Sequence, residues 1–317
     1  MTNLIKTTDL KTVMGFFKKF YLPKKNSHKG QNGKVLIVGG SSLFHAASLW
    51  AAETASYFVD MVHYCSTEEN ERIFLNLKTK FRNGIVVNRK DLLNYVQEDD
   101  AILIGPGMVR DSKIKSFPFT KILKNRQKLK VGIFEEILKL ENEGSYTYYL
   151  TQFLIDNFPE KKFVFDAGSL QMMKKKWFLK LKTVPIITPH QKEFERLFGK
   201  KIYDLKFEEK VKLVEECARK YKVVILLKAI KDVISNGEKT YVVEGGNQGL
   251  TKGGSGDVLA GLVVSFYAKN KALESAVFSS ILIKRTADVL FLKKGYWYNI
   301  SNLIEALSLV LKKIIIH

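Results

Sequence analysis

The stretch GGSGDVLAGLVV at residues 253–264 places four small residues and one carboxylate directly before an apolar helical pattern. Glycines let the backbone turn so that several N–H groups point at one spot. The helix that follows adds the positive end of its dipole to that spot. A simple helix cap does not need four small residues before it. The stretch therefore predicts an anion site, most naturally for a phosphate.

Asp257 is the one acidic side chain of this stretch. It does not suit a phosphate ligand, because two negative charges repel each other. Beside a phosphate, a carboxylate can instead take a proton from the group that attacks it. We therefore interpret Asp257 as the catalytic base of an enzyme that acts on a phosphoryl group. The cradle for that group would be Gly253, Gly254, Ser255 and Gly256.

Apolar runs of β type alternate with helical patterns along the chain. Continuous apolar strands separated by helices predict an α/β fold, with a mostly parallel sheet covered by helices on both faces. A hairpin is expected around Asn236-Gly237, between residues 232–234 and 240–243. The main predicted strands are residues 34–38, 101–104, 162–165, 184–187 and 223–227.

Polar or glycine-rich residues follow each of these five strands. The carboxyl edge of an open α/β sheet is where ligands bind, so the shared position is a stronger signal than any one motif. Taken singly, each motif also fits a structural role, such as a tight turn, a helix cap or a solvent-facing lysine. Asp166 fits either a helix cap or a Mg²⁺ ligand acting through water. The strand ends carry Gly39-Gly40-Ser41, Gly105-Pro106-Gly107, Asp166, Thr188-Pro189-His190 and Lys228.

Composition narrows the classes of function. The net charge is +20, which could attract nucleic acid, but no known nucleic-acid module is visible. Only eight of the 52 basic residues are Arg, so Lys dominates the positive charge. We interpret the charge as a Lys-rich surface; a field that attracts nucleotides is the alternative. Two cysteines outside any CxxC pair, and no apolar run long enough to cross a bilayer, predict a cytoplasmic protein without membrane partners. Neither a Walker A motif nor a GxGxxG turn is present.

In order and spacing, the motifs resemble those of the ADP/ATP-dependent NAD(P)H-hydrate dehydratases, a branch of the ribokinase-like superfamily. The resemblance covers roughly residues 28–312. The closing motif at 253–257 indicates the superfamily, and the other elements make the dehydratase assignment more specific. These elements are His28-Lys29-Gly30, Gly105-Pro106-Gly107-Met108, Asp166-Ala167, Thr188-Pro189-His190 with Glu193 and Arg196, Lys228 and Gly246-Asn247.

The resemblance implies a repair reaction. ATP or ADP, with Mg²⁺, would phosphorylate the C6 hydroxyl of hydrated NADH or NADPH, and elimination of phosphate would restore the reduced dinucleotide. Asp257 matches the catalytic position. The substrate would contact Ala46, Gly105, Gly107, His190 and Asp257. The adenine nucleotide would contact Lys228, Ala229, Ile230, Lys231, Asp232, Asn247 and residues 253–256.

Several positions depart from the family pattern. Gly168 stands where a second Asp is common, Val109 and Ala229 replace glycines, and Phe44 and His45 interrupt a usually small-residue helix start. We expect residues 28–317 to form the dehydratase domain and residues 1–27 an N-terminal extension without an epimerase domain. A homo-oligomer such as a tetramer, and cooperation with a separate epimerase, are further expectations from the resemblance.

Two alternatives stay open. A kinase of the same superfamily acting on a vitamin-precursor alcohol would share the glycine-rich motif and Asp257. A nucleotide-binding protein that has lost catalysis would account for the departures, although the intact 253–257 motif argues against it.

Overall fold

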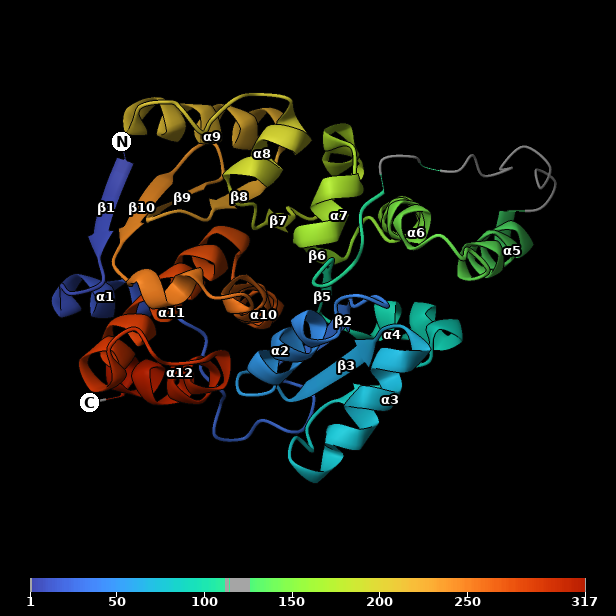
Figure 1. The fold of residues 1–317 in the computed structure, drawn as a ribbon, viewed down its shortest axis with the longest axis horizontal. Helices are drawn as coiled ribbons and strands as arrows, with labels where there is room; N and C mark the ends of the chain where they lie inside the picture. The colour runs from blue at the N-terminus through green and yellow to red at the C-terminus, as the bar shows by residue number, and fades with distance from the viewer. Residues whose placement is uncertain (1, 112–113, 115–125, 317) are drawn as a thin grey trace.

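The computed structural model describes residues 2–111, 114 and 126–316, and these build a ten-stranded sheet (Figure 1). The strand order is β1-β10-β9-β8-β7-β6-β5-β2-β3-β4. β9 runs antiparallel to its two neighbours, and all other pairs are parallel. The strands are β1 (Thr2–Lys6), β2 (Lys34–Val38), β3 (Met61–Cys65), β4 (Ile85–Val86), β5 (Ala101–Ile104), β6 (Lys162–Phe165), β7 (Ile186–Ile187), β8 (Val224–Leu227), β9 (Lys231–Ser235) and β10 (Thr240–Glu244).

The predicted strands are confirmed with small changes at their starts. Residues 184–187 shorten to β7, because Pro185 lacks an N–H and its carbonyl instead accepts from Val224. The predicted hairpin is confirmed as the antiparallel pair β9–β10. Three strands, β1, β3 and β4, were not predicted.

Helices cover both faces of the sheet (Figure 1). A hydrophobic core lies on each face of the sheet. Successive side chains of a strand point to opposite faces, so Val35 and Ile37 pack in one core and Leu36 and Val38 in the other. The first face carries α1 (Leu10–Phe17), α2 (Ala46–Ala55), α10 (Ser255–Lys269), α11 (Ala272–Lys294) and α12 (Ile300–Ile315). The second carries α4 (Leu92–Glu98), α5 (Arg126–Leu138), α6 (Glu143–Asn157), α7 (Ala167–Met172), α8 (Gln191–Phe198) and α9 (Phe207–Tyr221); α3 (Glu68–Asn76) follows β3.

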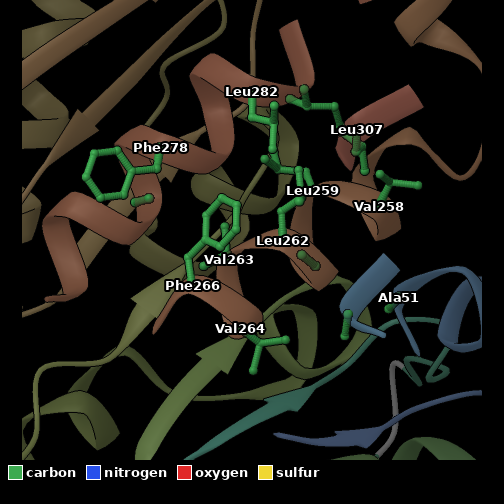
Figure 2. Packing of buried hydrophobic residues seen from close by; sticks show 14 of the residues in the cluster. Ala51, Val258, Leu259, Leu262, Val263, Val264, Phe266, Phe278, Leu282 and Leu307 are labelled. Carbon is green, nitrogen blue, oxygen red and sulfur yellow. The ribbon is translucent and has the colours of Figure 1, made fainter. Parts of the chain in front are cut away.

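α10 lies in the middle of the first core. Every residue from Val258 to Ala268 is buried, which is typical of a helix enclosed on all sides. Figure 2 shows Leu262 and Phe266 of this helix among side chains of α11, with Leu307 of α12 nearby. Dense packing fixes α10 in place, and its first turn carries Asp257.

The N-terminal residues join the same sheet and core. β1 pairs in parallel with β10, Ile5 is fully buried, and Val13 and Phe17 of α1 pack in the first core. Thr7 donates a hydrogen bond to Asp288 of α11. The segment expected as an N-terminal extension therefore contributes structure to the neighbouring elements.

Cys65 and Cys217 are both buried free thiols, in keeping with the absence of a CxxC pair. In the part of the chain that the structure describes, no helix combines the length and apolar character needed to span a bilayer.

Candidate active site

The carboxyl ends of β2, β5, β6, β7 and β8 meet at one edge of the sheet because these strands are parallel neighbours. A bridge between His190 and Lys228 continues the pairing of β7 with β8 at this edge. The convergence predicted from the strand ends is therefore present. His28-Lys29-Gly30 lies elsewhere: Gly30 sits beside Lys34 and Met61, at the opposite ends of β2 and β3.

The glycine-rich segment forms the N-terminus of α10. Gly254 is the N-cap with φ of +102°, and a Cβ there would lie 2.6 Å from the Trp50 ring, so the turn requires glycine. Ser255 follows and is only 8% exposed, yet its hydroxyl has no hydrogen-bond partner among the described residues. A buried unsatisfied hydroxyl beside helix N-terminal amides is what a site for a bound oxyanion provides.

Asp257 lies in the first turn of α10 and lines a cavity of about 690 Å³. Burial and the nearby charge of Asp166 raise the pKa of Asp257 to about 7, although Lys228 opposes the shift. A carboxyl group with a pKa near neutrality can both accept and return a proton at physiological pH. The geometry thus gives Asp257 the properties of a general base.

Lys228 connects the acidic groups of the site. Its Nζ donates to Asp166 Oδ1 at 2.8 Å, and Thr188 Oγ1 donates to the same oxygen at 2.8 Å. Burial would lower the pKa of Lys228, but the carboxylates of Asp166, Glu193 and Asp257 outweigh burial and raise it. Lys228 is therefore a fixed positive charge beneath the site rather than a solvent-facing lysine.

His190 caps α8 and also lines the cavity. Its Nδ1 accepts from the backbone N–H of Glu193, and Glu193 Oε2 accepts from the His190 N–H, which makes a capping box at the start of α8. The same side chain lines the cavity and is half exposed. Since Nδ1 is an acceptor, a neutral His190 carries its proton on Nε2.

The cavity contains some of the predicted substrate contacts. Gly107, His190 and Asp257 line it, and Ala47 lines it in place of the neighbouring Ala46. Gly105 lies in the turn behind Gly107 and is not part of the lining. Met108 and Arg196, from the family motifs, and Phe44 and Val109, from the departures, also line the cavity. Sequence reasoning did not single out four further lining residues: Leu43, Arg110, Gln171 and Lys192.

The predicted nucleotide segment has a buried support. Asp232 accepts from the Ala229 N–H and from Ser280, and lies 3.5 Å from the Lys284 ammonium. Lys284 also donates to the carbonyls of Ala229 and Ile230. The side chain of Asp232 thus shapes the turn that carries Lys228 and Lys231 and leaves the Ile230 side chain 91% exposed.

Asn247 has a similar structural use. Its Oδ1 accepts from the Gly249 N–H and from the Tyr298 hydroxyl, and its Nδ2 donates to the Ala287 carbonyl. These bonds fix the turn between β10 and the glycine-rich segment. A nucleotide contact from Asn247 or Asp232 would therefore use the backbone.

The departure at Gly168 has a steric reason. A Cβ at this position would collide with the Met108 carbonyl, because the α7 start packs directly against the turn after β5. This backbone leaves no room for the second Asp that is common in the family, and Asp166 is the carboxylate that remains.

Gly105→Ala is expected to destabilise the protein by about 2–4 kcal/mol, because Gly105 has φ of +126° and an added Cβ would collide with the Asp166 carbonyl. Gly15→Ala in α1 is the matched control: it meets no atom within 4 Å and should be neutral or stabilising. Thermal unfolding of both variants checks this. Equal melting temperatures would contradict the proposed packing of Gly105 on Asp166.

Residues for a protein-held metal are not brought together. Among the described residues, no cluster of three or more His, Cys, Asp or Glu side chains could hold a metal ion. Asp166 Oδ1 already accepts from Thr188 and Lys228, and Glu193 accepts from Gln171 and its own capping partner. Mg²⁺ usually keeps its waters and binds substrate phosphates with few protein carboxylates. The site therefore fits Mg²⁺ only as a companion of a nucleotide.

Comparison with known proteins gives consistent matches. The model of the NAD(P)H-hydrate dehydratase family matches residues 139–309. The chain is 30% identical to the ADP-dependent (S)-NAD(P)H-hydrate dehydratase of Nitrosopumilus maritimus, over 95% of this chain and 97% of that protein. It is also 30% identical to a bifunctional NAD(P)H-hydrate repair enzyme of Methanocaldococcus jannaschii, over 90% of this chain but only about half of that longer protein.

Solved structures show the same fold. The ADP/ATP-dependent NAD(P)H-hydrate dehydratase of Bacillus subtilis, co-crystallized with ATP/Mg²⁺, superposes with a TM-score of 0.72 at 20% identity and covers 96% of this chain and 97% of that chain. A ribokinase-like superfamily protein of Enterococcus faecalis superposes with a TM-score of 0.71 at 19% identity, covering 99% and 96% of the two chains. The fold is therefore ribokinase-like, as predicted.

Proposed function

Since this chain belongs to the NAD(P)H-hydrate dehydratase family, we propose that it dehydrates hydrated NADH or NADPH to the reduced dinucleotide, with ADP or ATP as the phosphoryl donor. One observation supports this proposal above the others. Asp257, with its pKa raised to about 7, faces a cavity from the same helix turn that holds the unpartnered Ser255 hydroxyl.

The proposed reaction has two steps that balance. The C6 hydroxyl of the hydrated ring attacks the terminal phosphorus of the nucleotide, its proton passes to the Asp257 carboxylate, and the nucleotide leaves one phosphate shorter. The C6–O bond then breaks with loss of the C5 proton, which gives the C5–C6 double bond and inorganic phosphate. The net change is hydrate plus ADP to reduced dinucleotide, AMP and phosphate.

The residues of this chain supply position and charge. The amides at the start of α10 and the Ser255 hydroxyl would hold the phosphoryl group as its charge develops. Asp257 would take the hydroxyl proton. Lys228 is held by Asp166, which also accepts from the Thr188 hydroxyl, and would keep enough positive charge nearby for Asp257 to ionise near neutral pH.

Mg²⁺ would enter with the nucleotide, coordinated mainly by phosphate oxygens and water, and would neutralise phosphate charge. The Bacillus subtilis relative was co-crystallized with ATP/Mg²⁺, which supports this part of the proposal. Two relatives are named as bifunctional NAD(P)H-hydrate repair enzymes, which is consistent with a second repair activity beside this one; we propose that this second activity is an epimerase.

The test is recovery of the reduced-nicotinamide absorbance band. Hydrated NADH or NADPH is incubated with the protein, Mg²⁺ and ADP or ATP, and a control omits the nucleotide. We expect recovery that depends on the nucleotide. Nucleotide consumption only with another alcohol would favour the superfamily kinase, and tight nucleotide binding without turnover would favour an inactive binding protein.

Turnover is expected to rise with pH and to level off above about pH 7. The pKa of Asp257 is raised to about 7, so below that pH the carboxyl is protonated and cannot accept the hydroxyl proton. Turnover at saturating substrate measured between about pH 5.5 and about pH 8.5 checks this. A flat profile across that range would contradict Asp257 as the titrating base.

A further inference from the structure

Three cations line the same cavity as Asp257. Arg110 follows the turn after β5, and Lys192 and Arg196 lie four residues apart on α8, so they share one face of that helix. All three are exposed, and within the described residues none of them forms an ion pair. We call this set the cationic rim.

Acidic residues lie beside the rim, but none of them forms an ion pair with its cations among the described residues: Glu195 accepts from the Ile202 and Tyr203 N–H groups, and Asp111 accepts from Asn142. Glu193 is only 4% exposed, and its two oxygens accept from the His190 N–H and from Gln171 Nε2. The guanidinium groups of Arg110 and Arg196 are therefore available to a ligand. The planar fork of Arg matches the oxygens of a phosphate better than other cations do.

The cavity also offers apolar surface. Leu43 and Phe44, before α2, are 69% and 50% exposed, and both line the cavity with Met108 and Val109. Large exposed apolar side chains at a cavity wall indicate a surface that a ligand covers. A ligand suited to this site thus has both a ring system and phosphate groups.

We propose that the cationic rim binds the phosphate groups of the dinucleotide substrate, with a ring of the substrate packed on Leu43 and Phe44. This inference rests on the proposed function and deepens it, because it assigns substrate recognition to residues outside the family motif around Asp257. The shared chemistry is a phosphate. The pyrophosphate of either dinucleotide and the 2′-phosphate of the phosphorylated one are its two sources.

The test measures binding of NADH and of NADPH by their fluorescence, without adenine nucleotide, to the wild type and to Arg110→Gln and Arg196→Gln. Loss of one charge-assisted phosphate contact is expected to weaken binding roughly tenfold. Weaker binding of both dinucleotides assigns the pyrophosphate; weaker binding of NADPH alone assigns the 2′-phosphate. Arg72→Gln is the control for net charge, since Arg72 is exposed on α3, pairs with Glu68 and does not line the cavity.

Unchanged affinity for both dinucleotides in both rim variants would overturn the inference. Binding of ADP and ATP to the same variants is measured by calorimetry, and a loss confined to these nucleotides would also overturn it, because the rim would then hold the donor. Equal weakening in Arg72→Gln would also overturn it, as an effect of overall charge. Turnover of the wild type is measured in parallel. No recovery of reduced dinucleotide by the wild type counts against the proposed function, whereas recovery with unchanged KM in the rim variants counts against the rim alone.

Discussion

Asp257→Asn is expected to lower turnover by a factor of roughly 10² or more while nucleotide affinity stays within about threefold of the wild type. Asn has nearly the shape of Asp but cannot accept the hydroxyl proton. The proposed phosphate cradle consists of the backbone amides at the start of α10 and the Ser255 hydroxyl, which the substitution leaves in place. Turnover by absorbance recovery and nucleotide binding by calorimetry measure the two effects separately.

The same variant has a built-in control for folding. The pKa of Asp257 is raised in the folded state, from 3.8 to about 7, so above the lower value the folded protein binds more protons than the unfolded chain and loses stability as pH rises. Asn does not ionise, so the variant does not lose stability in this way as the pH rises. Asp257→Asn should therefore melt at a higher temperature than the wild type at pH 8. Turnover above a tenth of the wild-type value would contradict the role of Asp257 as the base.

Lys228→Met is expected to destabilise the protein by about 3–5 kcal/mol and to move the acid limb of the turnover–pH profile to higher pH. Asp166 is only 2% exposed and would lose its ion-pair partner, keeping the Thr188 hydroxyl. The Lys228 charge also lowers the pKa of Asp257, so its removal raises that pKa and reduces turnover at neutral pH. Chemical denaturation and turnover against pH measure the two effects.

Asp166→Asn is the matched partner of this variant. The Asp166 charge raises the pKa of Asp257, so its removal should move the acid limb to lower pH, opposite to Lys228→Met. A merely structural role for the pair would destabilise both variants without separating their pH profiles. Shifts in the same direction, or none, would show that these charges do not tune Asp257.

The residues at the strand ends were predictable because short apolar runs, glycines and Pro189 mark where parallel strands stop. Their joint position followed from topology alone. Asp257 was predictable because its neighbours are small and the helix after it is apolar on every side. These signals are all local in the sequence.

The features that were missed depend on distant contacts. β1 is a five-residue edge strand whose partner β10 lies more than 200 residues later. β3 includes His63, a polar residue that is buried because its ring nitrogen bonds Asp99 at 2.9 Å. The pattern of apolar residues in the sequence does not indicate either contact.

The supporting side chains were missed for a similar reason. The resemblance implies a nucleotide contact from Asp232, but it gives no sign that the Asp232 side chain is bound by Ser280 and Lys284, which lie far along the chain on α11. The cationic rim draws Arg110 and Arg196 from two separate elements, and only the folded chain brings them to one cavity. Gly168 reads as a lost carboxylate in the sequence, whereas in the structure it is a packing requirement.

Phosphate release gives the most direct test, because a transferred phosphoryl group and its elimination must appear together. Hydrated NADH is mixed with the protein, Mg²⁺ and ADP, and inorganic phosphate and reduced dinucleotide are followed in the same sample. We expect one phosphate for each reduced dinucleotide formed, and neither product with Asp257→Asn. Reduced dinucleotide without phosphate, or a phosphorylated product that persists, would contradict the proposed role of the 253–257 segment.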